Sequence, residues 1–438
     1  MEPLSQADPQ DRPQLSLWKN PFAWVTEHSF SRNFWSYFLA IFCFDAGYGV
    51  FFFLFNLYLL DLGFSEKLMG WVGGAVTLGS VLVMMPVGLL SKRIGVKPLI
   101  ITCFVASPIF NALRAVYIWW PAQIALALLA GATMSAGTVC YLPAVARLTT
   151  DKNRTAAFSL IISASLGAAA LGGMICGYLP AWVKAAGISM HAADLKRIIL
   201  LVSCAVVLLG LLPLFRLQFP EPTNEPAQES TFQTSFRRWK PSPFLLRFLP
   251  LMALWAAVVA SFTPFGSVYL SSVLHMPMSQ IGLVFSGIQI VQLCMGAAAP
   301  IVFRALGLVN GIVVVQAGAG IMLCALALAH DVKLAVAAYL IVSALQWMSS
   351  PGLYDLVMSK TPDRQRNTAS AATLLWNSIA ASVATACCGV LFARFGYPRV
   401  LFGIAALALI VAVLVWLLLT PKDNGEQMVQ AGIAQPEV

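Results

Sequence analysis

The first apolar segment of the 438-residue chain contains a carboxylate, Asp45, near its middle. Tyr48, Phe52 and Asn56 follow it at helical spacing, which puts the four side chains on one stripe of a helix. If the segment crosses a membrane, an ionised side chain costs about 2.5–3.5 kcal/mol there, so Asp45 is a candidate for function. We expect it to bind and release a proton as a cavity opens and closes, or to pair with a cationic substrate group. The alternative is a permanently paired carboxylate, for which Arg114 is a candidate partner.

Further polar and aromatic side chains lie inside other apolar segments. Tryptophans at mid-membrane would form stacking or cation–π walls of a pocket, because tryptophans otherwise gather at the membrane interfaces. The alternative is that these amides and indoles bond neighbouring helices, at about 0.6 kcal/mol each on average. As a set the amides and tryptophans make the second half of the chain the more polar and aromatic side of the predicted cavity. These candidates for substrate binding are Tyr141, Tyr269, Gln289, Gln292, Gln346, Trp347, Trp376 and Asn377.

The composition of the chain indicates that these residues belong to a membrane protein. Apolar residues make up 59% and charged residues 10%, whereas soluble domains average about 45–50% and about 25%. This excludes a soluble enzyme, a disordered chain and a secreted disulfide scaffold. The net charge of +9 comes from short basic clusters between apolar runs, so we expect no nucleic-acid partner. The nine cysteines form no CxxC or Cys/His metal spacing, so neither a metal nor another cofactor is expected.

Twelve apolar segments are long enough to cross a bilayer as helices, for which about 20 residues are needed. Strands are excluded because a spanning strand takes only about 9–11 residues. The predicted fold class is an all-α polytopic membrane protein with 12 transmembrane helices in two six-helix bundles. The segments span residues 33–61, 67–90, 98–119, 122–147, 155–183, 198–217, 245–273, 279–303, 309–329, 333–358, 367–394 and 398–420.

Basic residues in the loops predict the orientation. With the N-terminus in the cytoplasm, 19 of the 27 Lys and Arg residues fall on the cytoplasmic side, as the positive-inside rule requires. Both termini are then cytoplasmic, and we expect a multi-pass protein of the inner (plasma) membrane. Residues 1–32 contain no apolar core or cleavage site, so no signal peptide is expected.

A stretch rich in Pro, Glu and Ser, followed by basic residues, separates the first six segments from the last six. This composition is typical of a linker. The predicted organisation is a cytoplasmic segment 1–32, a six-helix bundle 33–217, a cytoplasmic linker 218–244, a second six-helix bundle 245–420 and a cytoplasmic tail 421–438.

The two halves carry an internal repeat. The loop TTDKNRT at 149–155 is similar to TPDRQRN at 361–367, and aligning their Asp residues gives an offset of 363 minus 151, or 212. The same offset maps Gly95 onto Gly307. Because each copy has an even number of spans, both insert in the same orientation, which relates two parallel bundles by an axis along the membrane normal. Such an architecture places a cavity between the halves, and rocking exposes it to alternate sides.

The segment GLLSKRIGVK at 88–97 resembles the loop signature between the second and third helices of the major facilitator superfamily, roughly G-x-L-a-D-R-x-G-R-K. Gly88, Arg93 and Gly95 match, whereas Lys92 stands where the family has Asp. Together with the twelve segments and the repeat, the resemblance covers the whole chain. It implies the two-bundle fold of this family, secondary transport, and a loop that acts as a latch on the outward-open state.

Lys92 cannot accept the hydrogen bonds that the family's Asp accepts, so this latch is expected to be weak or replaced. In the second half, Arg304 and Asp355 lie near the inner ends of their segments and are candidates for a substitute latch. The alternative is that both side chains are solvated at helix ends.

We expect a secondary active transporter that moves a small organic solute by alternating access, coupled to protons. An aromatic, weakly polar cavity with one acid favours export of a drug or metabolite. An uptake symporter for a polar metabolite is the alternative. No G-x-x-x-x-G-K-[ST] motif is present, so ATP is not expected to drive transport through this chain.

Two other classes of protein agree less well with the sequence. An enzyme is not expected, because no cluster of His, Asp or Glu gathers at one membrane face. A non-transporting membrane sensor or scaffold stays open as an alternative. The expected partners are a small-molecule substrate, protons and the lipid bilayer, and the chain is expected to act as a monomer.

Overall fold

The structure is a computed structural model, and it describes residues 30–150, 153–187, 189–219 and 242–420. Twelve helical spans in these residues are long and apolar enough to cross a membrane, so this is a multi-pass membrane protein. The sixth span consists of α7 and α8, and the seventh of α10, the 3-10 turn η2 and α11. The first bundle contains α2 (Arg32–Asp61), α3 (Glu66–Ile94), α4 (Val96–Val116), α5 (Trp120–Leu148), α6 (Arg154–Ala185), α7 (Ala192–Leu209) and α8 (Leu211–Arg216). The second contains α10 (Pro243–Phe262), η2 (Thr263–Phe265), α11 (Gly266–Ser272), α12 (Met278–Leu306), α13 (Leu308–Leu328), α14 (Val332–Lys360), α15 (Asp363–Phe395) and α16 (Tyr397–Leu419).

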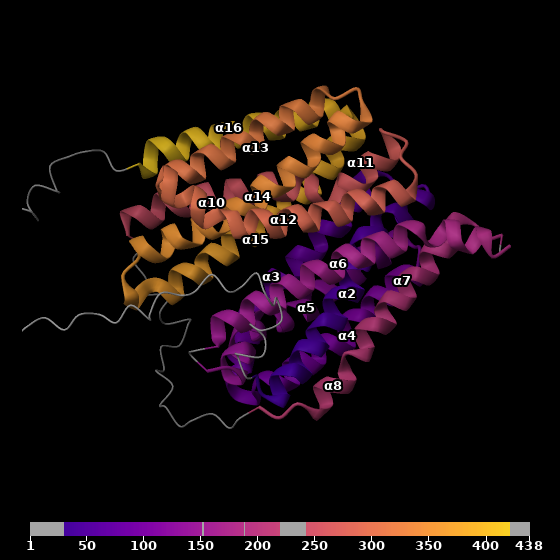
Figure 1. Ribbon diagram of the computed structural model, residues 1–438, viewed down its shortest axis with the longest axis horizontal. Helices are drawn as coiled ribbons and strands as arrows, with labels where there is room; N and C mark the ends of the chain where they lie inside the picture. The colour runs from indigo at the N-terminus through magenta and orange to yellow at the C-terminus, as the bar shows by residue number, and fades with distance from the viewer. Residues whose placement is uncertain (1–29, 151–152, 188, 220–241, 421–438) are drawn as a thin grey trace, which may run out of the picture.

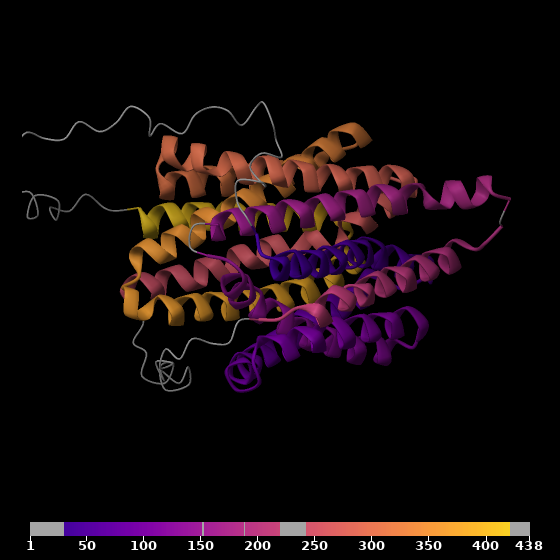
Figure 2. The same cartoon turned by 60° about the horizontal axis from the view of Figure 1, so that its bottom comes forward.

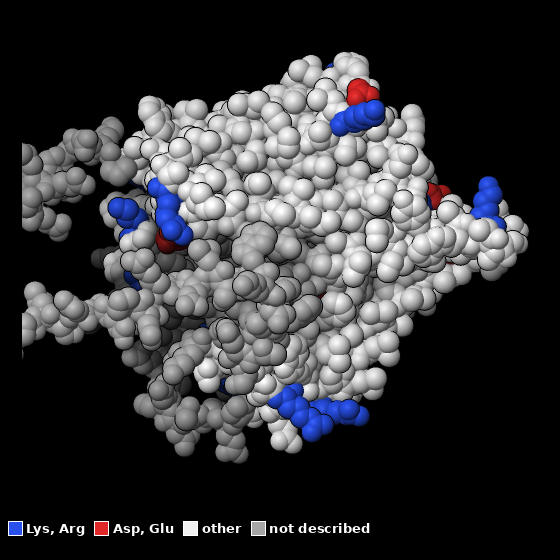
Figure 3. All heavy atoms as spheres, viewed as in Figure 1, with Lys and Arg blue, Asp and Glu red and all other residues white. Residues whose placement is uncertain are grey.

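The surface explains why these helices need a membrane. Charged side chains gather toward the ends of the spans and leave a wide uncharged belt between them (Figure 3). Large apolar side chains are exposed along the helices, among them Leu82, Ile301 and Val383. An apolar surface of this extent is unfavourable in water, whereas lipid tails solvate it, and helices satisfy their own backbone groups there.

The chain enters α2 and leaves α16 on the same side of the membrane, because it crosses twelve times. We call this the terminus side and the opposite one the far side. The first six spans form one bundle and the last six form another, and the two bundles lie side by side (Figures 1 and 2). Helices α12, α13 and α14 begin and end 212 residues after α3, α4 and α5, for example 278 minus 66 and 306 minus 94. The offset seen in the loops therefore holds for whole helices.

The two halves also share a turn between their second and third spans. Gly95 alone connects α3 to α4, and Gly307 alone connects α12 to α13. Their φ angles are 84° and 78°, with ψ angles of 174° and 156°. This region of backbone space is essentially confined to glycine. The glycines that the repeat pairs thus make the same tight turn in both bundles.

The bundles contact each other near the far side, through α3 against α15 and α6 against α12. Gly70 meets Gly389 at the first crossing, where a Cβ on Gly70 would lie 2.8 Å from the Cα of Gly389. Gly177 meets Gly282 at the second, where a Cβ on Gly177 would lie 3.1 Å from the Cα of Gly282. Toward the terminus side the bundles diverge (Figure 1). Glycine therefore permits close backbone packing where the halves meet.

The two crossings are copies of one contact. Each glycine is one repeat offset from a glycine of the other crossing, since 282 minus 70 and 389 minus 177 are both 212. A serine adds a hydrogen bond between the halves at each. Ser382 Oγ donates to the carbonyl of Gly74 at 2.7 Å, and Ser286 Oγ donates to the carbonyl of Ala170.

Candidate substrate cavity and gate residues

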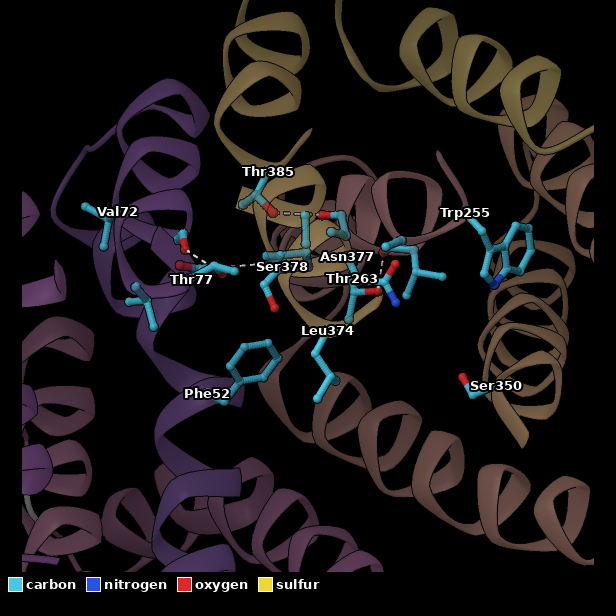
Figure 4. A pocket seen from close by; sticks show the side chains of 18 of the residues that line it. Phe52, Val72, Thr77, Trp255, Thr263, Ser350, Leu374, Asn377, Ser378 and Thr385 are labelled. Atoms are coloured by element: carbon cyan, nitrogen blue, oxygen red, sulfur yellow. Dashed lines mark hydrogen bonds between the residues drawn. The ribbon is translucent and has the colours of Figure 1, made fainter. Parts of the chain in front are cut away.

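A cavity of about 520 Å³ lies between the two bundles. Helices α2, α3 and α4 line it from the first bundle, and α10, η2, α14 and α15 line it from the second. Figure 4 shows Phe52 and Thr77 of the first bundle and Trp255, Leu374 and Asn377 of the second around one open space. Pockets for small organic molecules usually measure about 300–1,000 Å³, so this cavity has a suitable size.

Four of the residues predicted to bind substrate line this central cavity. Tyr48 and Asn56 reach it from α2, Arg114 from α4 and Asn377 from α15. Most of the remaining wall is apolar or aromatic, and Arg114 is the charged residue in the lining. Among the described residues, the structure therefore places one cation and no carboxylate in the lining of the central cavity.

A break in the seventh span lies beside Asn56. Helix α10 ends at Phe262, the 3-10 turn η2 follows, and α11 begins at Gly266. The Nδ2 of Asn56 donates to the carbonyl oxygen of Pro264 in this turn at 2.6 Å. Both residues line the central cavity, where irregular backbone is tolerated inside a membrane protein. The bond also joins the two bundles near the end of the cavity that faces the far side.

Arg114 is buried near the far-side end of α4, with 4% of its surface exposed. The carbon at the centre of its guanidinium lies 4.1 Å from the ring centroid of Phe55 and 5.6 Å from that of Phe51. Nη1 donates to Asn111 Oδ1 at 2.9 Å, whereas Nε has no hydrogen-bond partner. In the described part of the chain, no carboxylate forms an ion pair with this guanidinium.

Asp45 lines a neighbouring cavity of about 370 Å³ and not the central one. Its carboxylate accepts a hydrogen bond from Ser165 Oγ on α6. The predicted residues Tyr141 and Trp347 line the same cavity, Trp347 from α14 of the second bundle. Asp45 is thus separated from the rest of its stripe, and its partner in this structure is Ser165, not Arg114.

A third cavity of about 380 Å³ brings three other predicted residues together with Trp347. Gln289 and Gln292 reach it from α12, and Gln346 and Trp347 from α14. It shares Phe52 with the central cavity and Trp347 with the cavity of Asp45, so the three cavities adjoin. The polar side chains among the described residues of this lining come from the second bundle.

Tyr269 and Trp376 lie elsewhere. Tyr269 is 2% exposed and packs between Phe262 and Tyr397, with ring centroids 5.7 Å and 5.4 Å away. Trp376 is 51% exposed and does not line the central cavity, although its neighbour Asn377 does. The proposed site therefore omits both residues.

The residues of the predicted loop latch lie at the terminus-side end of α3. Arg93 is exposed, and a Cβ on Gly88 would meet no atom within 4 Å. Gly95 makes the turn into α4, and the side chain of Lys92 lies outside the described residues. Packing gives no reason for Gly88 in this conformation, in which the terminus side is open.

The substitute latch of the second bundle is not formed either. Arg304 and Asp355 are both exposed, and no ion pair of the described residues joins them. If Arg304 and Asp355 form a latch when the terminus side closes, their side chains would be separated in this conformation. The pair therefore stays a prediction for the other state.

Ser165, Asn111 and the crossing glycines Gly70 and Gly282 are not predicted from the sequence pattern. The repeat offers a signal for two of these cases. Ser165 is one offset from Asn377, so both halves carry a polar residue at an equivalent position in an apolar helix. Gly70 and Gly282 are also one offset apart. Asn111 has no such signal, because its role depends on Arg114 lying one helical turn away.

A sequence profile of the Major Facilitator Superfamily matches residues 37–385, well over half of the chain. The chain belongs to the major facilitator superfamily. No curated protein matches the sequence of this superfamily member. Its fold is similar to that of the nucleoside transporter NupG, with 14% identity and a TM-score of 0.72, over 89% of this chain and 100% of the other.

Two further solved structures agree with this fold. A bacterial homologue of the human lysosomal transporter Spinster, in an inward-facing and unoccupied conformation, has 12% identity and a TM-score of 0.72, over 88% of this chain and 96% of the other. The xylose transporter XylE from E. coli, in an inward-open conformation, has 15% identity and a TM-score of 0.69, over 90% and 98%. At these identities the likeness shows the fold.

Proposed function

We propose that the chain is a secondary active transporter that moves a small organic solute across the membrane by alternating access. One observation carries this proposal: a single central cavity lies between two repeated bundles that touch at the far side and diverge toward the terminus side. If the terminus side is cytoplasmic, as the loop charges predict, this conformation is inward-open. Rocking of the bundles would open the glycine crossings and expose the cavity to the other side.

Protons are the proposed coupling ion, and Asp45 is the proposed site. Its hydrogen-bond partner among the described residues is the neutral hydroxyl of Ser165. The other titratable side chains that line its cavity are Tyr37, Cys103 and Tyr141. No Lys or Arg of the described residues lines this cavity, and a carboxyl group in that setting can exchange a proton as its exposure changes.

Export of a drug or metabolite is the direction that we propose first. The aromatic part of the central lining, which includes Phe51, Phe52, Phe55 and Trp255, supports this preference. Uptake in symport with protons is the alternative. In liposomes that enclose a pH-sensitive dye, entry of the solute acidifies the lumen if the protein is a symporter and alkalinises it if the protein is an exchanger. This sign does not depend on how the protein is oriented in the vesicle.

The coupling is tested with Asp45→Asn. A panel of organic anions, neutral solutes and cations is screened for counterflow, which needs no proton gradient, and for proton movement. Asp45→Asn should abolish proton movement and keep counterflow. Asp331→Asn is the matched control, because Asp331 lies outside these cavities and accepts from Leu334 N as a helix cap, which Asn also does well.

The outcomes separate the alternatives. Proton movement at the wild-type rate in Asp45→Asn would remove the coupling role of Asp45. If no solute of the panel shows counterflow in the wild-type protein, the proposed transport function is refuted, and a non-transporting sensor or scaffold becomes the preferred function.

A further inference from the structure

We propose that the solute of the central cavity is an organic anion, and that Arg114 recognises its charge. This inference rests on the proposed transport function, because it names the substrate class of the same cavity. It also differs from the expectation of a cationic substrate paired with Asp45, since that carboxylate lines another cavity.

The first argument is the charge of the cavity. Arg114 is 4% exposed, and no acidic side chain occurs among the described residues that line the central cavity with it. In the part of the chain that the structure describes, the ion pair present joins Lys196 to Asp61 on other helices. A buried charge without a counterion is expensive, so buried charges in proteins are normally paired. A bound anion would complete the pair that the protein leaves open.

The second argument is the geometry of the guanidinium. Stacking on Phe55 at 4.1 Å and the hydrogen bond from Nη1 to Asn111 fix the plane of the group. These contacts do not involve Nε or Nη2, and Nε is fully buried with no hydrogen-bond partner in the described residues. Two parallel N–H groups on one guanidinium edge match the two oxygens of a carboxylate or the oxygens of a phosphate. The protein thus holds an arginine whose buried Nε lacks a partner, and an anion that binds this edge would have to displace the atoms that cover Nε.

The third argument concerns the rest of the ligand. One cation neutralises one negative charge, and the other polar groups of the lining, such as Asn56, Thr77 and Asn377, are neutral. The volume of about 520 Å³ and the aromatic wall suit a small molecule with an apolar or aromatic body. The inferred class is a small organic monoanion, for which a monocarboxylate is the simplest example.

The test uses series of equal shape and different charge. The probes are phenylacetate, phenylacetamide and 2-phenylethylamine, together with hexanoate, hexanamide and hexylamine. Binding to the full-length protein in detergent is measured by the shift of its thermal unfolding midpoint. In at least one series, the acid should bind at least tenfold more tightly than its amide, equal to about 1.4 kcal/mol, and the amine should not bind.

Variants assign that preference to Arg114. Arg114→Gln should bind acid and amide equally, whereas Arg114→Lys should keep part of the preference, because a lysine retains the charge and loses the fork. Arg394→Gln is the matched control. The guanidinium of Arg394 also lies over a ring, 5.4 Å from the centroid of Phe395, but it is exposed and outside the cavity. Its substitution should leave all shifts unchanged.

The charge series on the wild-type protein decides the inference even if an Arg114 variant does not fold. Equal binding of acid and amide, binding of the amine, or no binding by either acid would overturn it. Counterflow of the same probes in liposomes separates this result from the proposed function. If an acid binds through Arg114 but shows no counterflow, the proposed transport function is refuted and the inferred anion site is kept. Counterflow of only the amides or amines keeps transport and refutes the anion site.

Discussion

Gly70→Ala is expected to shift the protein toward a state that is open on the far side. A Cβ on Gly70 would lie 2.8 Å from the Cα of Gly389 and 2.8 Å from the carbonyl oxygen of Thr385. Both are backbone atoms, so no side-chain rotation relieves the overlap. Ordinary contacts begin at 3.4 Å, so α3 and α15 must separate by about 0.6 Å, which is 3.4 minus 2.8.

The size of the shift follows from this overlap. Overpacking of a well-packed site costs about 1–3 kcal/mol. The cost applies to the closed far side, because separated bundles relieve it, and the ratio of open to closed protein should rise about 5- to 150-fold. Gly389→Ala should act more strongly, since its Cβ would lie 2.5 Å from the carbonyl oxygen of Glu66 and requires about 0.9 Å of separation, 3.4 minus 2.5.

The assay measures opening at the other crossing. Ser286 is 7% exposed and donates across the halves to the carbonyl of Ala170, so the thiol of Ser286→Cys is protected while the far side is closed. Its modification by a membrane-impermeant methanethiosulfonate is followed by mass spectrometry of the peptide that contains it. Because α3–α15 is perturbed and α6–α12 is observed, faster modification requires that the bundles move as rigid bodies.

Gly403→Ala is the control for a glycine-to-alanine change within a membrane helix, because its Cβ would meet no atom within 4 Å. It should leave the modification rate unchanged. If Gly70→Ala and Gly389→Ala are folded and also leave the rate unchanged, the glycine crossings do not limit opening. The reasoning would then be refuted.

Three further predictions concern single contacts. Asn56→Ala removes a hydrogen bond between the halves, and such a bond contributes about 0.6 and at most about 1.7 kcal/mol in membranes. The modification rate of Ser286→Cys should therefore rise about 3- to 18-fold. An unchanged rate would contradict this. Lys196→Met leaves Asp61 without its partner at 2.7 Å and should lower the free energy of unfolding, measured in denaturant, by about 1–3 kcal/mol. Adding Asp61→Leu to the same chain should restore part of this loss. A double variant as unstable as the single one would count against the pair. Gly95→Ala and Gly307→Ala should each lower the free energy of unfolding by about 1–3 kcal/mol, because both place a side chain on a residue with positive φ, although the surrounding space is open. The two variants should lower the thermal unfolding midpoint by similar amounts. If one of them left the midpoint unchanged, the two turns would not be equivalent.

Much of the scaffold could be predicted because apolar length and loop charge are local properties of the sequence. The segment predicted at 122–147 is α5, Trp120–Leu148, and the one predicted at 33–61 is α2, Arg32–Asp61. The seventh segment was predicted as one run, and the structure divides it at Thr263–Phe265. Pro264 marks this break, because proline has no N–H to donate to the carbonyl of Ala260 one turn earlier.

The positions of the site residues were harder to predict, because they depend on how neighbouring helices cross. Asp45 and Tyr48 lie on one stripe of α2, yet they border different cavities. A stripe that runs along a helix passes from one neighbour to another when those neighbours cross it at an angle. For Trp376 and Asn377 the geometry of one helix suffices. Adjacent residues point about 100° apart, so Asn377 faces the cavity together with Ser378 on one side of it, whereas Trp376 on its other side does not.

The repeat and the site differ in a way that bears on mechanism. The crossing glycines recur at the offset of 212, but the charged groups do not: Asp45 corresponds to Ala257, and Arg114 to Leu326, which is 1% exposed. Symmetric contacts at the two crossings allow the bundles to rock about one axis. A charge held by one bundle alone travels with that bundle during the motion. An anion bound to Arg114 would therefore keep its strongest contact while its neutral contacts in the second bundle are exchanged, and this asymmetry lets the solute stay bound as the cavity changes sides.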